Sequence, residues 1–279
     1  MIEELVKCFK DENDTIRELA SSAIMKVANV ERGREYIVEN KIIVDVTKLF
    51  EDDIVGIRSN AYHTLINLAD FMYGISSIID YEINVIEILV NRLVLEVEES
   101  ILILVLKLMN VLLEGGRSQS IILTTLAHPR LNEHLQSKNK LIRELAARNL
   151  GSISFNERGK EATIKAESIP LLCKMLHDEV SDCRVAATRA LCSLAQLKEG
   201  KVQIFDLGEI ETIIKLLDDP SDQTRLNVVQ LIAALAEYPD AREKSKDCLP
   251  TLRNLVDDEK FPLVSRFAAT AIDVIVWTP

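Results

Sequence analysis

One complete repeat unit stands in residues 139–178, NKLIRELAARNLGSISFNERGKEATIKAESIPLLCKMLHD. Its first part places apolar residues at the spacing of one face of an α-helix, and an Arg stands near the start of that pattern. A short segment follows around a Gly, and an apolar segment then ends on an acidic residue. The unit therefore predicts three successive helices and no β-strand.

The opening of this unit recurs along the chain as an apolar residue or Thr, Cys or Ser followed by Arg. We call these positions the anchors, and they are Arg17, Arg58, Arg143, Arg184, Arg225 and Arg266, with Ile101 in the one wider gap. Their spacing is about 42 residues, the armadillo period, whereas two-helix tetratricopeptide repeats are near 34. The sequence predicts an all-α, right-handed α-α superhelix of armadillo/HEAT type with about seven repeats.

We expect a single solenoid over residues 1–279, without a second domain. We expect the first repeat to be incomplete and to lack its short first helix, so Leu5, Val6 and Phe9 are predicted to be partly uncovered. The predicted units are 1–30, 31–71, 72–114, 115–156, 157–197, 198–238 and 239–279.

Each anchor is followed by a stripe of residues three, seven and ten positions later, such as Ala187, Leu191 and Leu194 after Arg184. The small residue at the third position is predicted to let a neighbouring helix approach closely. Asp273 breaks the stripe in the last repeat, as expected where no further repeat covers that face. A Gly sixteen positions after four anchors is predicted to end one helix and admit a sharp turn; these are Gly33, Gly74, Gly159 and Gly200.

Composition narrows the function classes. The chain is 48% hydrophobic and carries a formal charge of −11, which repels phosphate backbones and anionic lipid headgroups, so nucleic acid and membranes are not expected partners. The longest apolar run is too short to span a bilayer, and we do not expect the first residues to act as a leader peptide, because they read as an amphipathic helix with Glu3 and Glu4. Five cysteines without a CxxC pair are typical of reduced thiols in a cytoplasmic protein.

Residues that could perform catalysis are few. HExxH, GxSxG, P-loop and GxGxxG motifs are absent from the sequence, so we expect no enzyme, no cofactor and no small-molecule substrate. The one metal-site hypothesis places His128 and His134 near a turn with Glu133 between them. Solvated histidines beside a Pro-containing turn explain the same residues, and this interpretation is preferred.

A protein-binding groove is the favoured functional hypothesis. In a solenoid the inner helix of each unit faces partners, and positions five and nine after each anchor lie away from the buried stripe. Asn67 and Asn110 are predicted to hold an extended peptide backbone, while Arg148 and Arg189 meet acidic side chains. The remaining groove residues are His63, Ser152, Ser193 and Gln230, and the same ladder includes Ser22, Lys26, Leu106, Ala234, Ala271 and Ile275. Ordinary solvated helix residues are the alternative explanation for any single position.

Acidic residues gather at the turns before the anchors. They are Glu51, Asp52, Asp53, Asp178, Glu179, Asp218, Asp219, Asp257, Asp258 and Glu259. Helix capping and solubility are the preferred explanation, and a docking edge for a basic partner is the alternative.

The strings NERGKEATIKAESIPLLCKMLHD and LKEGKVQIFDLGEIETIIKLLDD resemble the armadillo repeat family. Importin-α-type adaptors carry Trp at the fifth position and Asn at the ninth, whereas this chain has no Trp there and keeps Asn only at Asn67 and Asn110. A closer resemblance, to the radial spoke head 14 family of motile cilia and flagella, lies in RLVLEVEES, KNKLIRELAARNLGSIS, QTRLNVVQLIAALAEYPDAREK and AIDVIVWTP.

That resemblance implies a non-catalytic structural subunit of the axonemal radial spoke, located in the cytoplasm, cytoskeleton and ciliary axoneme. Its partners would be other radial spoke subunits bound along the solenoid surface. Direct contact with tubulin is not expected, because tubulin is itself acidic. The alternative is a cytosolic armadillo adaptor or regulatory subunit of a signalling complex.

Overall fold

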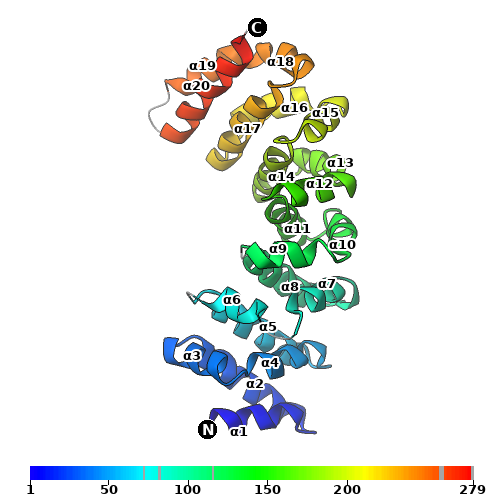
Figure 1. Ribbon diagram of the computed structural model, residues 1–279, viewed down its shortest axis with the longest axis vertical. Coiled ribbons are helices and arrows are strands. Elements are labelled where there is room, and N and C mark those ends of the chain that lie inside the picture. Colours follow the sequence, from blue (N-terminus) through cyan, green and yellow to red (C-terminus); the bar gives the residue numbers. More distant parts are fainter. Residues whose placement is uncertain (72, 81–82, 115, 258–260, 278–279) are drawn as a thin grey trace. The chain divides into compact units, whose positions relative to one another are not determined.

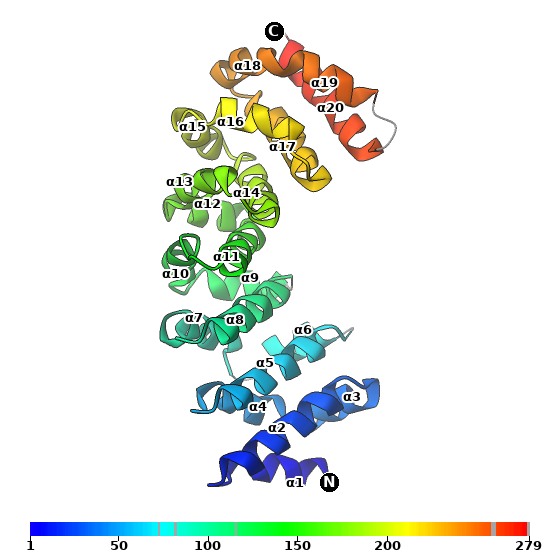
Figure 2. The same ribbon diagram turned by 180° about the vertical axis from the view of Figure 1, so that it is seen from behind.

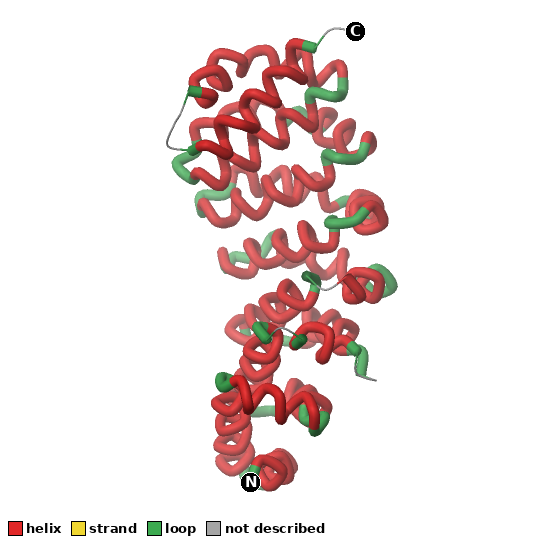
Figure 3. The backbone as a smooth tube through the Cα atoms, turned by 60° about the vertical axis from the view of Figure 1, so that its left-hand side comes forward, coloured by secondary structure: helices red, strands yellow, loops and turns green. Residues whose placement is uncertain are grey.

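The computed structural model describes residues 1–71, 73–80, 83–114, 116–257 and 261–277. Throughout these ranges the chain forms helices joined by short loops and no strand, as the tube in Figure 3 shows. The predicted all-α helical-repeat solenoid is therefore confirmed. The chain divides into two compact units, Met1–Arg130 and Leu131–Pro279, which are described separately. No helix of the described residues is long and apolar enough to cross a bilayer.

Unit 1 contains three long helices, α2, α5 and α8, and short helices between them (Figure 1). The long helices are the ones that begin at the anchors, and α5 packs against both α2 and α8. The bounds are α1 Ile2–Lys7, α2 Asp14–Ala28, α3 Glu31–Glu39, α4 Ile43–Lys48, α5 Val55–Ala69, α6 Gly74–Ile79, α7 Val85–Leu95, α8 Glu99–Leu112 and α9 Gly116–Ile122.

Unit 2 repeats this arrangement with four long helices, α11, α14, α17 and α20, each packed against the next (Figures 1 and 2). Helix α10, Ala127–His134, leads into it. The other bounds are α11 Lys140–Ile153, α12 Glu157–Lys165, α13 Ser168–Lys174, α14 Ser181–Leu194, α15 Lys198–Asp206, α16 Ile210–Lys215, α17 Asp222–Leu235, α18 Pro239–Ser245, α19 Leu249–Val256 and α20 Pro262–Val276.

The predicted stripe is part of the buried core. Ala187, Leu191 and Leu194 of α14 are all fully buried, and α14 packs against both α11 and α17. On α20 the corresponding stripe is exposed, with Asp273 in its middle, which agrees with the prediction that nothing covers this face. In unit 1, Leu5 and Val6 are half-buried as predicted, but the expectation for Phe9 is wrong, because this side chain is only 7% exposed.

The glycines that were predicted to form the turn after a long helix lie instead inside the next helix, so the reason given for them is wrong. Gly159 and Gly200 lie in the first turn of the following helix and have ordinary negative φ values. A Cβ at Gly159 would collide with the carbonyl oxygen of Ile153, and one at Gly200 with that of Leu194. The glycines are therefore needed because two helices approach closely, and not because the backbone requires a positive φ.

The left-handed turn residues stand later in the repeat. Gly208 has φ 77° after α15, while Lys41 and Glu167 have φ 57° and 58° at the corresponding places after α3 and α12. All three occupy the position just beyond a helix C-cap, where a left-handed residue ends the helix. Lys41 and Glu167 carry the steric cost of a Cβ in this conformation, which Gly208 avoids.

Four anchor arginines form ion pairs with a carboxylate in the next repeat, and in three of them the partner is an aspartate. The guanidinium of Arg184 donates to the carboxylate of Asp219 at 2.6 Å, and Arg143 donates to Asp178 at 2.7 Å. Arg17 does the same with Asp52 at 2.8 Å in unit 1. Each aspartate lies in the turn before the next long helix, so one side chain from each repeat fixes the turn of the next.

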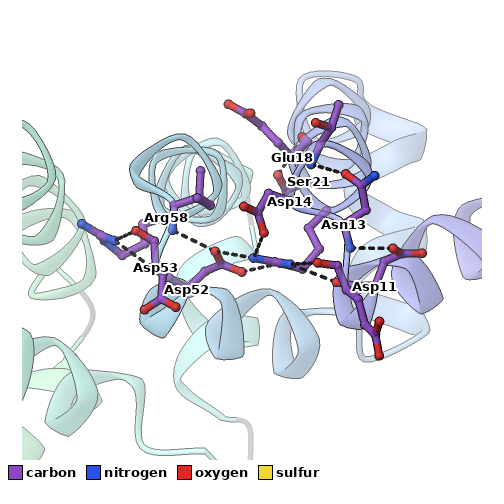
Figure 4. A network of polar contacts seen from close by, with 12 residues as sticks. Asp11, Asn13, Asp14, Glu18, Ser21, Asp52, Asp53 and Arg58 are labelled. Carbon is purple, nitrogen blue, oxygen red and sulfur yellow. Dashed lines mark hydrogen bonds and ion pairs between the residues drawn. The ribbon is translucent and has the colours of Figure 1, made fainter.

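Five of the six anchor arginines also donate to backbone carbonyl oxygens in the turn of their own repeat. Arg58 donates to the carbonyl oxygens of Asp52 and Asp53, at 2.7 and 3.1 Å, as Figure 4 shows. The same guanidinium reaches forward to the buried carboxylate of Glu96 at 3.2 Å, which Arg92 also binds. Asp52 is thus bound through its carboxylate by one anchor and through its carbonyl by the following one.

The acidic residues before the anchors therefore have two different environments. Asp52, Asp178 and Asp219 are ion-paired, and each carboxylate also accepts the backbone N–H two residues later. The explanation by capping and solubility is incomplete for these three, because ion pairing between repeats is their main contact. Glu51, Asp53, Glu179, Asp218 and Asp257 are exposed, whereas Asp258 and Glu259 lie outside the described residues.

The sequence around Ile101, the one anchor that is not Arg, lacks both members of the ion pair between repeats. Ile101 replaces Arg, and Ser137 stands six residues before the next anchor, at the position of Asp52, Asp178 and Asp219 in other turns. The Ser137 hydroxyl still accepts the N–H of Asn139 at 3.1 Å, so the turn keeps its internal hydrogen bond. A carboxylate at this position would have no anchor arginine to pair with.

We expect acid to weaken the ion pairs between repeats. Burial raises the pKa of Asp178, but hydrogen bonds from Arg143 and the N–H of Val180 outweigh it, and the pKa lies below its ordinary value. The stabilisation is complete above the unfolded pKa of about 3.9 and is lost as the pH falls through the folded value. Asp178→Asn should cost about 2 kcal/mol of unfolding free energy at neutral pH, and the difference from wild type should shrink near pH ~3, measured by urea denaturation.

Glu179→Gln is the matched control, since it removes the same charge from an exposed neighbour. An equal loss in both variants, or a loss from Asp178→Asn that is independent of pH, would contradict the assignment.

The left-handed positions give a second prediction, for thermal or urea unfolding. Glu167→Gly should raise the unfolding free energy by up to ~1 kcal/mol, because Gly adopts this conformation without the Cβ clash. Gly208→Ala should lower it by about 1 kcal/mol although no atom lies within 4 Å of the new Cβ. Changes of the opposite sign would show that φ does not limit stability here.

A candidate protein-binding groove

A groove crosses three consecutive long helices of unit 2, α11, α14 and α17. It encloses a cavity of about 580 Å³, and the predicted ladder residues Arg148, Arg189, Ser193 and Gln230 line it. Ser152 is half-buried on α11 but is not part of the lining. The other lining residues are Phe155, Lys160, Val185, Ala186, Cys192, Gln196, Gln223, Leu226 and Asn227. Sequence periodicity therefore placed four of its side chains on one surface.

The groove is basic although the protein as a whole is acidic. Arg148, Lys160 and Arg189 line it, and no Asp or Glu does. Arg148 is already paired with Glu144 of its own helix at 2.8 Å. Arg189 and Lys160 make no ion pair with any residue that the structure describes.

Phe155 and Lys160 are two of the nine lining residues that the sequence analysis missed. Phe155 follows α11 and is 78% exposed, and Lys160 comes from α12. Phe155 stands twelve positions after its anchor, as does Gln196 after Arg184, and both line the cavity. This twelfth position lies beyond the long helix, so the helical pattern used to find the ladder could not include it. The recurrence of that position in the groove is the signal that could have found it.

The floor of the groove is held by a polar network. The Asn227 amide donates to the carbonyl of Val185 at 3.1 Å and to the Thr188 hydroxyl at 3.2 Å. Gln223 donates to the Asn227 side-chain oxygen at 3.0 Å. Because these bonds join α17 to α14, the floor is fixed before any partner binds.

The remaining predicted groove residues lie in unit 1. His63 and Asn67 are on α5 and Asn110 is on α8, and all three are half-buried. The Asn67 amide donates to the side-chain oxygen of Asn29 at 2.6 Å, so this donor is already bound. Burial and the nearby charge of Lys107 lower the pKa of His63. The groove lined by Arg148 and Arg189 does not include these residues.

Four ladder positions do not face solvent as predicted. Leu106 and Ala271 are fully buried, Ile275 is 1% exposed and Ala234 is 7% exposed. All four are apolar, so the helices bury these side chains against their neighbours. On α20 this places Ala271 and Ile275 in the core, and the polar ladder ends at α17. Ser22 is half-buried and Lys26 is exposed on α2.

The histidines do not form a metal centre with the residues described. Among those residues, His, Cys, Asp and Glu side chains do not gather in any group of three that could hold an ion. His128 is buried, and burial lowers its pKa. The neighbours proposed with it, Glu133 and His134, are exposed and half-buried, respectively.

Comparison with known proteins supports the repeat fold. A family model for the HEAT repeat matches residues 169–197. A crystal structure of an engineered protein superposes with a TM-score of 0.90 at 22% identity, covering 100% of this chain and 69% of that one. A designed armadillo repeat protein superposes with a TM-score of 0.55 at 17% identity, covering 99% and 100%. No curated protein matches the sequence.

The fold is that of an armadillo-like helical-repeat solenoid. At these identities the structures show the fold alone. Such solenoids are typical of non-enzymatic scaffolds that bind other proteins.

The groove thiol offers a test of this geometry. Burial raises the pKa of Cys192 to about 11, and Lys160 partly opposes the rise. Since the thiolate is the reactive form, we expect alkylation of Cys192 by iodoacetamide at pH ~8 to be at least about tenfold slower in the folded protein than in urea. Mass spectrometry of the labelled peptides measures this ratio, and equal rates would show that the thiol is not buried in the groove wall.

Proposed function

We propose that this protein is a non-catalytic scaffold that binds a segment of a partner protein in the groove on α11, α14 and α17. The observation that carries the proposal is one continuous cavity lined by three consecutive repeats. Extended peptides suit such a surface because they can contact each repeat in turn. The hydrogen bonds in the floor reduce the ordering cost of binding.

A more specific proposal concerns the complex in which the scaffold works. We propose that it is a structural subunit of the axonemal radial spoke of motile cilia and flagella, and that other spoke subunits bind along its surface. The support is the resemblance of RLVLEVEES, KNKLIRELAARNLGSIS, QTRLNVVQLIAALAEYPDAREK and AIDVIVWTP to the radial spoke head 14 family. Residence in the cytoplasm, the cytoskeleton and the ciliary axoneme follows from this proposal.

The alternative is an adaptor or regulatory subunit of a cytosolic signalling complex. The same groove serves that function, because the fold fixes the surface and not the partner. The two proposals differ in where the protein is found and in which proteins it retains.

Capture from solubilised motile cilia separates these proposals. The tagged wild-type chain should retain radial spoke subunits, and a double variant, Arg148→Glu with Arg189→Glu, should retain at least about tenfold less. Lys174→Glu with Lys215→Glu is the matched control, because both lysines are exposed on unit 2 and neither lines the groove.

Equal retention by the wild type and the groove variant would contradict binding in the groove. Retention of signalling proteins without any axonemal protein would contradict the spoke proposal and support the adaptor.

A further inference from the structure

Two cations of the groove, Lys160 and Arg189, can be compared with Lys201 and Arg148, which stand at the same positions in neighbouring repeats of unit 2. Lys201 stands one repeat after Lys160, at the corresponding position, and forms an ion pair with Glu237 at 2.5 Å. The residue that corresponds to Glu237 for Lys160 is Gln196, which lines the groove. An amide cannot neutralise the ammonium group, so Lys160 keeps an uncompensated charge.

The second charge shows the same relationship. Arg148 pairs with Glu144, four residues earlier on its own helix, at 2.8 Å. Arg189 is the corresponding arginine on α14, and Val185 stands four residues before it. Val185 lines the groove and cannot form an ion pair. At both cations, the carboxylate found in the neighbouring repeat is replaced by an uncharged side chain.

These substitutions give one cavity with two unpaired cations. Lys160 comes from α12 and Arg189 from α14, and both face the same space, where no Asp or Glu lines the wall. Unpaired cations in a partly enclosed site attract anions more strongly than cations on an open surface, because less water screens them. Gln196 and Ser193 add polar groups beside them.

We infer that the groove of unit 2 is an acidic-peptide site in which Lys160 and Arg189 bind carboxylates of an extended partner segment. This inference rests on the proposed function, and it names the chemistry of the partner. The partner's carboxylates take the places that Glu144 and Glu237 hold in the neighbouring repeats. The exposed ring of Phe155 provides an apolar contact at the rim.

The spacing of the site sets the length of the segment. Neighbouring helices lie about 10 Å apart, and an extended chain rises about 3.3 Å per residue. A segment of roughly seven residues therefore crosses α11, α14 and α17. Two acidic residues within it are sufficient for the two cations.

Three synthetic peptides of about ten residues test the inference by fluorescence anisotropy with the full chain. One alternates Glu and Ser, the second has Gln in place of each Glu, and the third has Lys. We expect the Glu peptide to bind at least about tenfold more tightly than the other two, and to weaken as NaCl rises from about 0.05 to about 0.3 M.

Two variants restore the missing carboxylates. Val185→Glu places a partner beside Arg189 as Glu144 stands beside Arg148, and Gln196→Glu copies Glu237. Each should weaken binding of the Glu peptide by about five- to tenfold while leaving the circular dichroism spectrum unchanged. Gln203→Glu, on the exposed surface of α15, adds the same charge outside the groove and should have little effect.

The peptide groove and its preference for acidic segments can fail separately. If the Gln or Lys peptide binds as well as the Glu peptide and Ser193→Trp abolishes that binding, the acidic specificity is wrong and the peptide groove stands. If Gln203→Glu weakens the Glu peptide as much as Gln196→Glu does, the attraction is not located in the groove and the inference is overturned. If none of the three peptides binds, both the inference and the peptide groove are contradicted.

Discussion

At three junctions, an ion pair between an anchor arginine and the aspartate of the next turn fixes how consecutive repeats stack: Arg17–Asp52, Arg143–Asp178 and Arg184–Asp219. Apolar stripes such as Ala187, Leu191 and Leu194 supply burial, but burial is not directional and permits helices to slide or rotate. The Arg184–Asp219 pair is directional, and the Asp219 side chain is only 2% exposed. Burying both charges without their pairing would be costly, so this one geometry is strongly selected.

The groove depends on this registration. Because Arg143 and Arg184 each hold the following turn, α11, α14 and α17 begin at equivalent places. Residues five positions after each anchor then lie on one surface, which places Arg148, Arg189 and Gln230 along one cavity. Inside the groove, the Asn227 amide donates to Val185 and Thr188, and these bonds hold α17 in the same alignment with α14. Each of these helices therefore carries an anchor residue that aligns the repeats and, five positions later, a residue that lines the groove.

Helical periodicity predicts those parts of the fold that depend on neighbours along one helix. The long helices, the buried stripes and the exposed side of Arg148 and Arg189 follow from a period of 3.6 residues. The pairing of Arg17 with Asp52 joins residues far apart in the sequence, and the pattern alone does not show that their side chains meet. The role of Gly159 was mistaken for the same reason, since the carbonyl it approaches belongs to another helix.

The site was predictable to a similar extent. Ser193 and Gln230 were found because they lie on the regular helices, whereas Phe155 and Lys160 come from a turn and a short helix. Ala271 and Ile275 were wrongly expected at the surface, because α20 has no later helix over its stripe and buries another face. Comparing equivalent positions between repeats, as with Lys160 and Lys201, is the more informative method for such residues.

Site-specific photo-crosslinking tests the central claim most directly. A benzophenone side chain at Phe155, on the groove rim, should form an adduct with a partner protein in the cells that produce this chain. The same group at Leu207, an exposed apolar residue of unit 2 outside the groove, should not. Adducts at Leu207 without adducts at Phe155 would show that partners use another face, and would contradict the assignment of the groove as the binding site.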